Sequence, residues 1–356
     1  MTTEAGGVSG DMAGNRVLVT GAGGFIGTHL VAYLKRQGHY VRGVDLRYPE
    51  YCPSEADEFE ILDLRVPENC VRAARGMDEV YALAADMGGM GFISGNHARI
   101  FHNNALINLN TLEAARQNGL SRYLFTSSAC VYPDYLQSAT SVTPLKEEDV
   151  YPAQPQDAYG WEKLMAERVC THYREDYGIE TRIARFHNIF GPLGAWDGGR
   201  EKAPAALCRK IAIAKVSGRG EVEIWGDGEQ TRSFCYIDDC VVALTRLMQS
   251  DYAEPLNIGQ DRLVSINELA TMIAAIAGIE ITPVHVAGPQ GVRGRNSDNT
   301  RVGEVLGWQP RITLEQGLER TYHWIEREVR DRVVSEDGTI SSALTTDRGA
   351  AASQPR

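Results

Sequence analysis

The chain has 356 residues, with 36 basic and 47 acidic side chains and a formal net charge of −11. This length favours one large α/β unit or two subdomains, and the acidic balance argues against a nucleic-acid or anionic-membrane surface. No apolar run is long enough to span a membrane, which takes about 18 residues. The seven cysteines form no C-x-x-C pair and no metal-ligand spacing. They indicate reduced thiols, a cytoplasmic location and no bound metal.

The first predicted unit is a strand, a glycine-rich turn and a helix. Residues 16–20 (RVLVT) read as a β-branched strand, and an apolar-periodic helix is expected over 28–38. Between them, the GxxGxxG spacing is set by Gly21, Gly24 and Gly27. Such a turn places backbone N–H groups and the positive end of a helix beneath a pyrophosphate. We therefore predict a dinucleotide site over 21–27, which includes Phe25 and Ile26.

The second predicted strand, over 40–47, carries Asp45 near its end. A carboxylate there would accept hydrogen bonds from both ribose hydroxyls and repel a 2′-phosphate, which predicts NAD rather than NADP. Asp63 could accept a hydrogen bond from the adenine amino group, and its neighbour Leu64 completes the expected cofactor contacts. For both aspartates, a surface position in a loop is the alternative interpretation.

Strand and helix signals continue to alternate along the next part of the chain. The predicted elements are strand 79–85, helix 96–119, strand 123–128, helix 157–177 and strand 181–190. This alternation predicts an α/β fold with a Rossmann-type, doubly wound parallel sheet covered on both faces. The expected division is a disordered tail over 1–13, an NAD-binding domain over 14–190, a mainly substrate-binding smaller subdomain over 191–334 with some segments returning to the Rossmann domain, and a disordered tail over 335–356.

Two of these elements carry the reacting groups. Ser128 ends the strand 123–128, and in an extended segment Cys130 would point to the same side. Tyr159 and Lys163 lie one turn apart on one face of the predicted helix 157–177. A serine with a Tyr-x-x-x-Lys pair is the set that hydride chemistry on a sugar alcohol requires. The thiol adds a group that a second acid–base step would need, although a small core residue is the alternative for most of the cysteines.

Three later loops could contact a substrate. The glycine- and methionine-rich loop 86–96 lets backbone approach a ligand closely, or is a mobile surface turn. The loop 191–210 holds a charged triplet ending at Lys202, which could equally be a solvated face. Guanidinium groups bind phosphates in bidentate geometry, and a nucleoside diphosphate would need two or three of them. The third stretch, 225–239, holds the candidate Arg232, and the later segment 291–299 holds the candidates Arg293 and Arg295.

Together these motifs resemble the extended short-chain dehydrogenase/reductase family that acts on nucleotide sugars. The motifs are the glycine turn, Ser128, Tyr159 with Lys163, RFHNIFGP (185–192) and GDGEQTRSF (226–234). A narrower set resembles the GDP-mannose 3,5-epimerase group of that family. That set is DMGGMGFI (86–93), SSACVYP (127–133), YGWEKLMAE (159–167), GGREKAPAALCRK (198–210) and GVRGRNSDN (291–299), and the match covers about residues 16–325.

The resemblance implies the roles of individual residues. The implied catalytic residues are Ser128, Cys130, Tyr159, Lys163 and Lys202, of which Tyr159 and Lys163 also bind NAD. The implied contacts to a GDP-sugar are Gly88, Ser128, Ala129, Cys130, Asn188, Glu201, Lys202, Lys210, Gln230, Arg232 and Arg295. The resemblance also suggests a homodimer formed through the helix pair 96–118 and 157–177.

The residue types suggest a mechanism. Tyr159, with its pKa lowered by Lys163 and by the charge of the nicotinamide, would remove the proton of the carbon-4 hydroxyl while hydride passes to NAD. The resulting 4-keto sugar has acidic protons at carbons 3 and 5. Cys130 and Lys202 would then exchange these protons on opposite ring faces, and hydride would return to carbon 4.

Two alternatives remain open. Another nucleotide-sugar enzyme, such as a 4-epimerase or a 4,6-dehydratase, would keep the hydride half of this chemistry. A non-catalytic NAD-sensing protein could keep the glycine turn. It would have no reason to hold Ser128, Tyr159 and Lys163 together.

Overall fold

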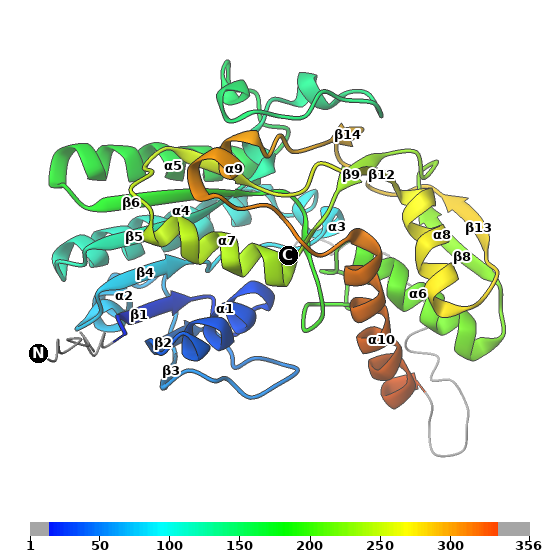
Figure 1. The fold of residues 1–356 in the computed structure, drawn as a ribbon, viewed down its shortest axis with the longest axis horizontal. Coiled ribbons are helices and arrows are strands. Elements are labelled where there is room, and N and C mark those ends of the chain that lie inside the picture. Colours follow the sequence, from blue (N-terminus) through cyan, green and yellow to red (C-terminus); the bar gives the residue numbers. More distant parts are fainter. Residues whose placement is uncertain (1–13, 334–356) are drawn as a thin grey trace, which may run out of the picture.

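The computed structural model describes residues 14–333, and the two predicted tails lie outside the described residues. Its centre is a seven-stranded parallel sheet with the order β11-β6-β5-β4-β1-β2-β3 (Figure 1). The strands are β1 (Arg16–Thr20), β2 (Tyr40–Asp45), β3 (Glu58–Ile61), β4 (Glu79–Ala82), β5 (Arg122–Ser128), β6 (Glu180–Phe186) and β11 (Pro255–Ile258). This is the predicted doubly wound α/β fold.

The strand sequences explain why the sheet is buried on both faces. Val17, Leu124 and Ile183 are fully buried in the centres of β1, β5 and β6, as expected for apolar runs in a parallel sheet. The ladder between β4 and β5 ends at Ala82 opposite Phe125, whereas β5 continues beside β6 to Ser128. The end of β5 therefore projects beyond its neighbour at the carboxyl edge of the sheet, where ligands bind in such folds.

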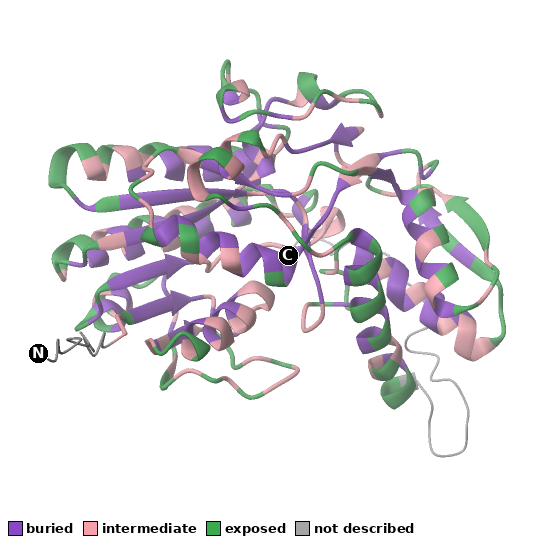
Figure 2. Ribbon diagram, viewed as in Figure 1, coloured by how far each residue is buried: buried purple, intermediate pink, exposed green. Residues whose placement is uncertain are grey.

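Helices cover the sheet in two layers. One layer contains α1 (Phe25–Arg36) and α7 (Ile237–Gln249), which contact each other; the other contains α2 (Pro67–Ala74), α4 (His97–Gln117) and α5 (Ala158–Tyr177). The buried apolar residues of the two layers belong to two different clusters, and Figure 2 shows that the strands between the layers are largely buried. In the described residues, no helix is long and apolar enough to cross a membrane.

A smaller lobe lies beside the carboxyl edge of the sheet (Figure 1). Its helices α6 (Ala203–Ser217), α8 (Ile266–Ala277) and α10 (Leu314–Val333) pack together, next to the parallel pair β8 (Glu221–Trp225) and β13 (Thr282–Val286). Two small sheets connect the lobe to the rest. They are β12 (Leu263–Ser265), β9 (Thr231–Ser233) and β14 (Gly294–Arg295), and the pair β7 (Ile189–Phe190) and β10 (Cys235–Tyr236). The remaining short elements are α3 (Met90–Ile93), α9 (Thr300–Leu306), η1 (Ala129–Val131), η2 (Asp134–Gln137) and η3 (Glu147–Val150).

Two predicted elements differ from the structure. The strand predicted over 181–190 is broken, because Asn188 adopts a left-handed backbone with φ of 48°. Its side-chain Nδ2 donates to the carbonyl of Ser233 at 2.9 Å, and the following strand, β7, pairs with β10 outside the main sheet. The first helix begins at Phe25 rather than at residue 28, since the helix starts inside the glycine motif.

Candidate active site

The glycine turn forms an anion-binding helix terminus. Gly21 has a φ of +71°, and a Cβ on Gly27 would lie 2.1 Å from the carbonyl oxygen of Gly21, so only glycine allows this tight approach. No side chain caps the start of α1, and its first turn holds no acidic residue. The free N–H groups at this end are therefore open to a phosphate.

Asp45 lies directly beside this turn. Its Oδ2 accepts a hydrogen bond from the backbone N–H of Gly23 at 3.0 Å, and its Oδ1 accepts one from that of Leu46 at 2.6 Å. Burial raises the pKa of the Asp45 carboxyl group, and these backbone hydrogen bonds oppose the rise. The glycine cradle and the adjacent carboxylate fit a dinucleotide with an unmodified ribose.

Asp63, the predicted acceptor for the adenine amino group, is already hydrogen-bonded within the protein. The carboxylate of Asp63 accepts hydrogen bonds from Arg65, including one from Nη2 at 2.7 Å, and this contact lowers the pKa of Asp63. Leu64 is buried. The adenine contacts of Asp63 and Leu64 stay predictions.

At the end of β5, the serine and the cysteine face a common site, but not through an extended segment. The chain turns into η1 immediately after Ser128, and the backbone N–H of Cys130 donates to Ser128 Oγ at 3.2 Å. Helix α5 starts against this turn, because a Cβ on Gly160 would lie 2.1 Å from the carbonyl oxygen of Cys130. The expected extended geometry is therefore wrong, since Ser128 acts as the cap of a short helical turn.

Tyr159 and Lys163 lie in the first turns of α5, below this serine. Tyr159 is 6% exposed. Burial raises the pKa of its hydroxyl well above the ordinary value, and a hydrogen bond with Ser128 opposes the rise. The predicted lowering depends on the charge of the bound nicotinamide as well as on Lys163, and it stays a prediction for the occupied site.

Lys163 is held in place by the end of β5. Its Nζ donates to the carbonyl of Thr126 at 2.9 Å and lies 5.7 Å from the centroid of the Tyr159 ring. Burial lowers the pKa of Lys163, and the neighbouring Glu162 carboxylate opposes this. The carbonyl of Thr126 therefore fixes the ammonium group close to the Tyr159 ring.

Lys202 comes from the smaller lobe, as the residue that precedes α6. Its segment packs on the loop before α3: the N–H of Gly89 donates to the carbonyl of Arg200 at 3.1 Å, and a Cβ on Gly89 would lie 2.4 Å from that of Glu201. Although Lys202 is exposed to solvent, desolvation by surrounding protein lowers its pKa, opposed by the charge interaction with Cys130. The two proposed proton carriers therefore interact electrostatically.

Two arginines lie side by side where the small sheet meets η2. Arg232 and Arg295 are register partners in β9 and β14, and in residues 14–333 neither forms an ion pair with a carboxylate. Burial, together with repulsion from Arg295, lowers the pKa of Arg232 to about 9. An uncompensated cationic pair fits a diphosphate. Arg293, in contrast, is neutralised by Asp227, with N–O distances of 2.7 Å.

The other candidate substrate contacts lie near these groups or are engaged within the protein. Gln230 Nε2 donates to the carbonyl of Trp225 at 3.1 Å, whereas its buried Oε1 has no protein partner. Glu201 pairs with Arg209 at 3.0 Å, and Lys210 Nζ donates to the carbonyl of Glu223 at 3.3 Å. Gly88 and Ala129 are buried.

The sequence did not predict the roles of two residues that support the site without belonging to the predicted set of site residues. Arg200 lies over the Phe92 ring at 4.0 Å and clamps the loop 86–96. Gln137, in η2, is buried and contacts Arg295. Arg200 belongs to the charged triplet of the loop 191–210, but its contact with Phe92 leaves no signal in the sequence. Gln137 has no sequence signal, because it acts through Arg295, far away in the chain.

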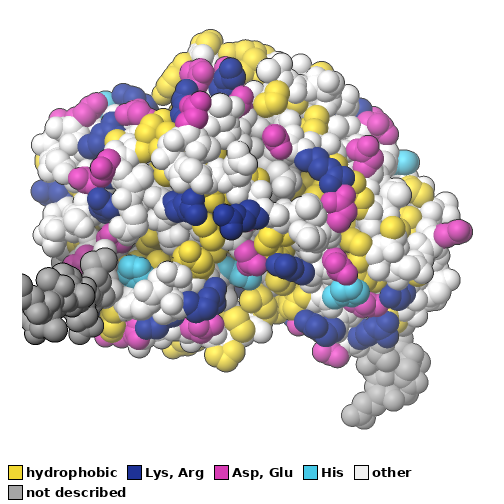
Figure 3. Space-filling view, in the orientation of Figure 1, with side chains coloured by type: hydrophobic (Ala, Val, Ile, Leu, Met, Phe, Trp, Pro, Cys, Tyr) yellow, Lys and Arg dark blue, Asp and Glu magenta, His cyan; other side chains and the backbone are white. Residues whose placement is uncertain are grey.

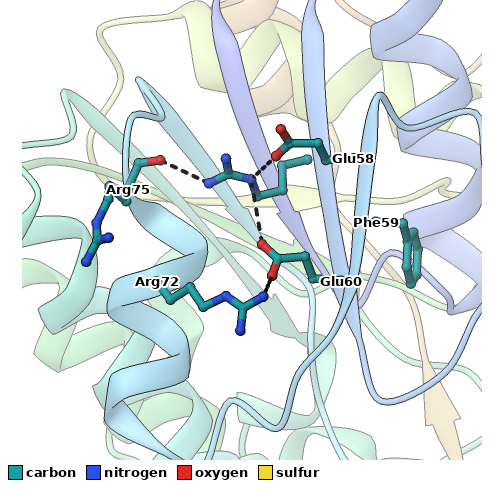
Figure 4. A pocket seen from close by; sticks show the side chains of 6 residues that line it. Glu58, Phe59, Glu60, Arg72 and Arg75 are labelled. Carbon is teal, nitrogen blue, oxygen red and sulfur yellow. Dashed lines mark hydrogen bonds and ion pairs between the residues drawn. The ribbon is translucent and has the colours of Figure 1, made fainter.

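On the face in Figure 3, basic and acidic side chains are interspersed. The open pocket in Figure 4 lies at the β2–β3 edge, where Arg42 pairs with Glu58 at 2.7 Å and Arg72 pairs with Glu60. Two of its three arginines are paired with its two glutamates, and it lies away from the reacting groups. Among the described residues, no cluster of metal-binding side chains occurs.

A glycine turn with a ribose carboxylate, followed by a serine and a tyrosine–lysine pair at the sheet edge, defines a dinucleotide-dependent enzyme of the dehydrogenase/reductase type. Residues 17–259 match the NAD dependent epimerase/dehydratase family, and the chain belongs to this family. The cofactor is therefore NAD, and the glycine turn with Asp45 fits it.

Three known proteins illustrate the relationship. The chain is 51% identical to a GDP-mannose 3,5-epimerase of Arabidopsis thaliana over 88% of this chain and 83% of the relative. A UDP-glucose 4-epimerase from Thermotoga maritima, solved with UDP-glucose, matches with a TM-score of 0.79 at 28% identity, over 88% of this chain and 99% of that one. A UDP-glucuronic acid 4-epimerase from Bacillus cereus, solved with UDP-glucuronic acid and NAD, gives 0.75 at 26% identity, over 88% and 99%.

Proposed function

We propose that the protein epimerises GDP-D-mannose at carbons 3 and 5, through a transient 4-keto sugar, to GDP-L-galactose and/or GDP-L-gulose. The observation that carries this proposal is a thiol beside the hydride-transfer residues: Cys130 contacts Ser128 and interacts electrostatically with Lys202. The 51% identity to the Arabidopsis enzyme supports the same substrate.

Bound NAD supplies the acceptor, and later the donor, of the carbon-4 hydride. In the proposed mechanism, Tyr159 takes the hydroxyl proton of carbon 4, while Ser128 hydrogen-bonds the same oxygen. Lys163 holds a positive charge near the tyrosine, which favours the tyrosinate once the site is occupied. The free N–H groups of α1 and the carboxylate of Asp45 hold the cofactor in place.

Cys130 and Lys202 act on the carbon-bound protons in this proposal. The thiolate accepts a proton from carbon 3 or 5, and the electron pair of that C–H bond forms the enolate of the 4-keto sugar. The Lys202 ammonium delivers a proton to the opposite ring face, which inverts the carbon. Arg232 and Arg295 bind the diphosphate; Asn188, Gln230 and Lys210 contact the rest of the substrate.

The decisive experiment is incubation with GDP-mannose in deuterium oxide, with the products resolved by NMR. We expect deuterium at carbons 3 and 5 of GDP-L-galactose and at carbon 5 of any GDP-L-gulose. Inversion at carbon 4 without deuterium at carbons 3 and 5 would instead identify a 4-epimerase. Loss of the carbon-6 hydroxyl would identify a 4,6-dehydratase.

We also propose a cytoplasmic homodimer formed through α4 and α5. These helices pack side by side, and Leu109 and Trp161 on them are 38% and 45% exposed. Apolar side chains of this size on neighbouring helices suit a second copy of the same pair. All seven cysteines are unpaired, in keeping with a reducing compartment. Light scattering after size exclusion tests the dimer, and Trp161→Glu should give monomers.

A further inference from the structure

We propose that Arg295 is a positioning residue that holds Cys130 in its thiolate form, and that Gln137 aims Arg295 at the sulfur. The proposal rests on the function assigned above and gives one member of the cationic pair a second task. It explains how a cysteine could serve as a base at neutral pH when no histidine of residues 14–333 is hydrogen-bonded to its sulfur.

The three nitrogen atoms of the Arg295 guanidinium group have different partners. Its Nη1 donates to Cys130 Sγ at 3.3 Å, and its Nε donates to Gln137 Oε1. Its Nη2 donates to no atom of the described residues. Nη1 is thus bound to the sulfur of Cys130 and Nε to the side-chain amide of Gln137, while Nη2 stays available to an anionic substrate.

Gln137 is fixed so that only its oxygen can face Arg295. Its Nε2 donates to the carbonyls of Tyr132 and Pro133, both at 3.1 Å, and the residue is 1% exposed. These contacts occupy the amino group and decide the orientation of the amide. The glutamine is therefore a rigid acceptor, and the three hydrogen bonds set the angle of the guanidinium group.

The backbone supports the same alignment. The N–H of Arg293 donates to the carbonyl of Gln137 at 2.9 Å, and a Cβ on Gly294 would lie 2.2 Å from the carbonyl of Ala139. The loop after η2 and strand β14 therefore touch directly. Arg295 cannot shift along this contact without breaking it.

The charged and titratable groups that face Cys130 come from several elements. Tyr159 and Lys163 lie on α5, Lys202 lies at the start of α6, Arg232 lies on β9 and Arg295 lies on β14. Only Arg295 donates a hydrogen bond to the sulfur among the described residues. Neighbouring cations favour the ionised form of a thiol, and a direct N–H donor does so most strongly.

The test is alkylation of Cys130 by iodoacetamide as a function of pH, in protein as purified, with the labelled peptide quantified by mass spectrometry. Only the thiolate reacts. We expect Arg295→Met to move half-maximal labelling to higher pH and to slow labelling at neutral pH about tenfold, because a smaller fraction of the sulfur would be ionised. Arg295→Lys, which keeps the charge but loses the fork, should slow labelling less.

Two further variants separate the contact from the general field. Gln137→Met should slow the labelling of Cys130 while Arg295 is intact. Arg293→Met is the matched control, because this arginine lies two positions away and pairs with Asp227, and it should label like the wild type. Unchanged labelling in Arg295→Met overturns the proposal, as does equal slowing in Arg293→Met. Unchanged labelling in Gln137→Met overturns the role of the glutamine.

Because labelling needs no sugar, this proposal and the proposed function fail separately. If Arg295→Met is labelled more slowly than the wild type, but the wild-type protein does not epimerise GDP-mannose, only the proposed function is refuted. In an active enzyme, the acidic limb of the kcat profile should move to higher pH in Arg295→Lys. An acidic limb that stays in place would count against Arg295 even if substrate binding weakens.

Discussion

At the scale of single residues, hydride transfer and proton exchange are assigned to neighbouring side chains. Ser128, Tyr159 and Lys163 suffice for oxidation at carbon 4, and a thiol adds nothing to that step. Cys130 lies within one turn of Ser128, so one bound sugar can reach both sets. This proximity allows the two half-reactions to be separated by mutation.

Cys130→Ala should stop epimerisation but leave oxidation at carbon 4 largely intact. Loss of a general acid–base group slows the reaction about 100-fold or more. The variant should accumulate bound NADH when it is given GDP-mannose, visible as absorbance of reduced nicotinamide. Tyr159→Phe should give neither NADH nor product.

Cys130→Ser is the sharper comparison. Serine keeps the size and a hydrogen-bonding atom, but its hydroxyl ionises far less readily than a thiol. We expect nearly the same loss of epimerisation as with alanine. If the serine variant keeps most of the activity, Cys130 is a packing residue and not a base.

The Lys202 ammonium group should set the basic limb of the pH profile. Desolvation by the surrounding protein lowers its pKa below the ordinary value of 10.5. The protonated acid is therefore lost as pH rises through this lowered pKa, and kcat should already fall below pH 10.5. The measurement is kcat against pH at saturating substrate. A profile that stays flat up to the ordinary lysine pKa would contradict the assignment.

At the scale of elements, the position of Lys202 depends on a contact between two loops. The loop 86–96 and the residues before α6 touch through backbone atoms at Gly89. Arg200 reinforces this contact by stacking on Phe92. The lysine therefore reaches the sheet edge only while both loops stay packed.

Gly89→Ala should weaken this contact. Its Cβ would lie 2.4 Å from the carbonyl of Glu201, and overpacking of this kind costs about 1–3 kcal/mol. We expect a lower kcat with unchanged NAD content, because the glycine turn lies elsewhere. Gly95→Ala is the control, since its nearest contact is an ordinary 3.8 Å. Equal losses in both variants would refute the role of the contact.

The end of β2 should decide the choice of cofactor. A 2′-phosphate would lie against the Asp45 carboxylate, so NAD should be strongly preferred over NADP. Asp45→Ser removes a charged hydrogen-bond acceptor worth about 1.5–3 kcal/mol and should narrow that preference about tenfold or more. Affinities for both cofactors, measured on stripped protein, provide the test. Equal affinities in the wild type would show that Asp45 does not contact the ribose.

How far the sequence predicts the structure depends on the range of the interactions involved. The alternating elements and the glycine turn follow from local periodicity, and the structure confirms the α/β fold. The break at Asn188 and the turn at Ser128 could not be predicted, because a distant carbonyl and a side-chain cap determine them. The burial of Tyr159, which raises the pKa of its hydroxyl, could not be predicted either, because it depends on packing that one motif cannot reveal.

At the scale of the whole molecule, the cofactor should stay with the protein through each cycle. Hydride leaves carbon 4 and returns to it, so no net oxidation occurs. We expect purified protein to contain NAD and to turn over without added cofactor, as measured by cofactor extraction and by product formation. Stoichiometric build-up of NADH during turnover would contradict a closed cycle.

The position of β11 has a consequence for synthesis of the chain. This strand, Pro255–Ile258, is the edge of the main sheet beside β6, yet it follows α6 and β8 in the sequence. A nascent chain that ends before residue 255 therefore exposes the open edge of β6, and unpaired strand edges invite aggregation. The main sheet is therefore complete only after β11 has been synthesised, and α6 and β8 of the smaller lobe precede β11 in the chain. Ribosome-bound chains stalled before and after β11 should differ sharply in protease resistance.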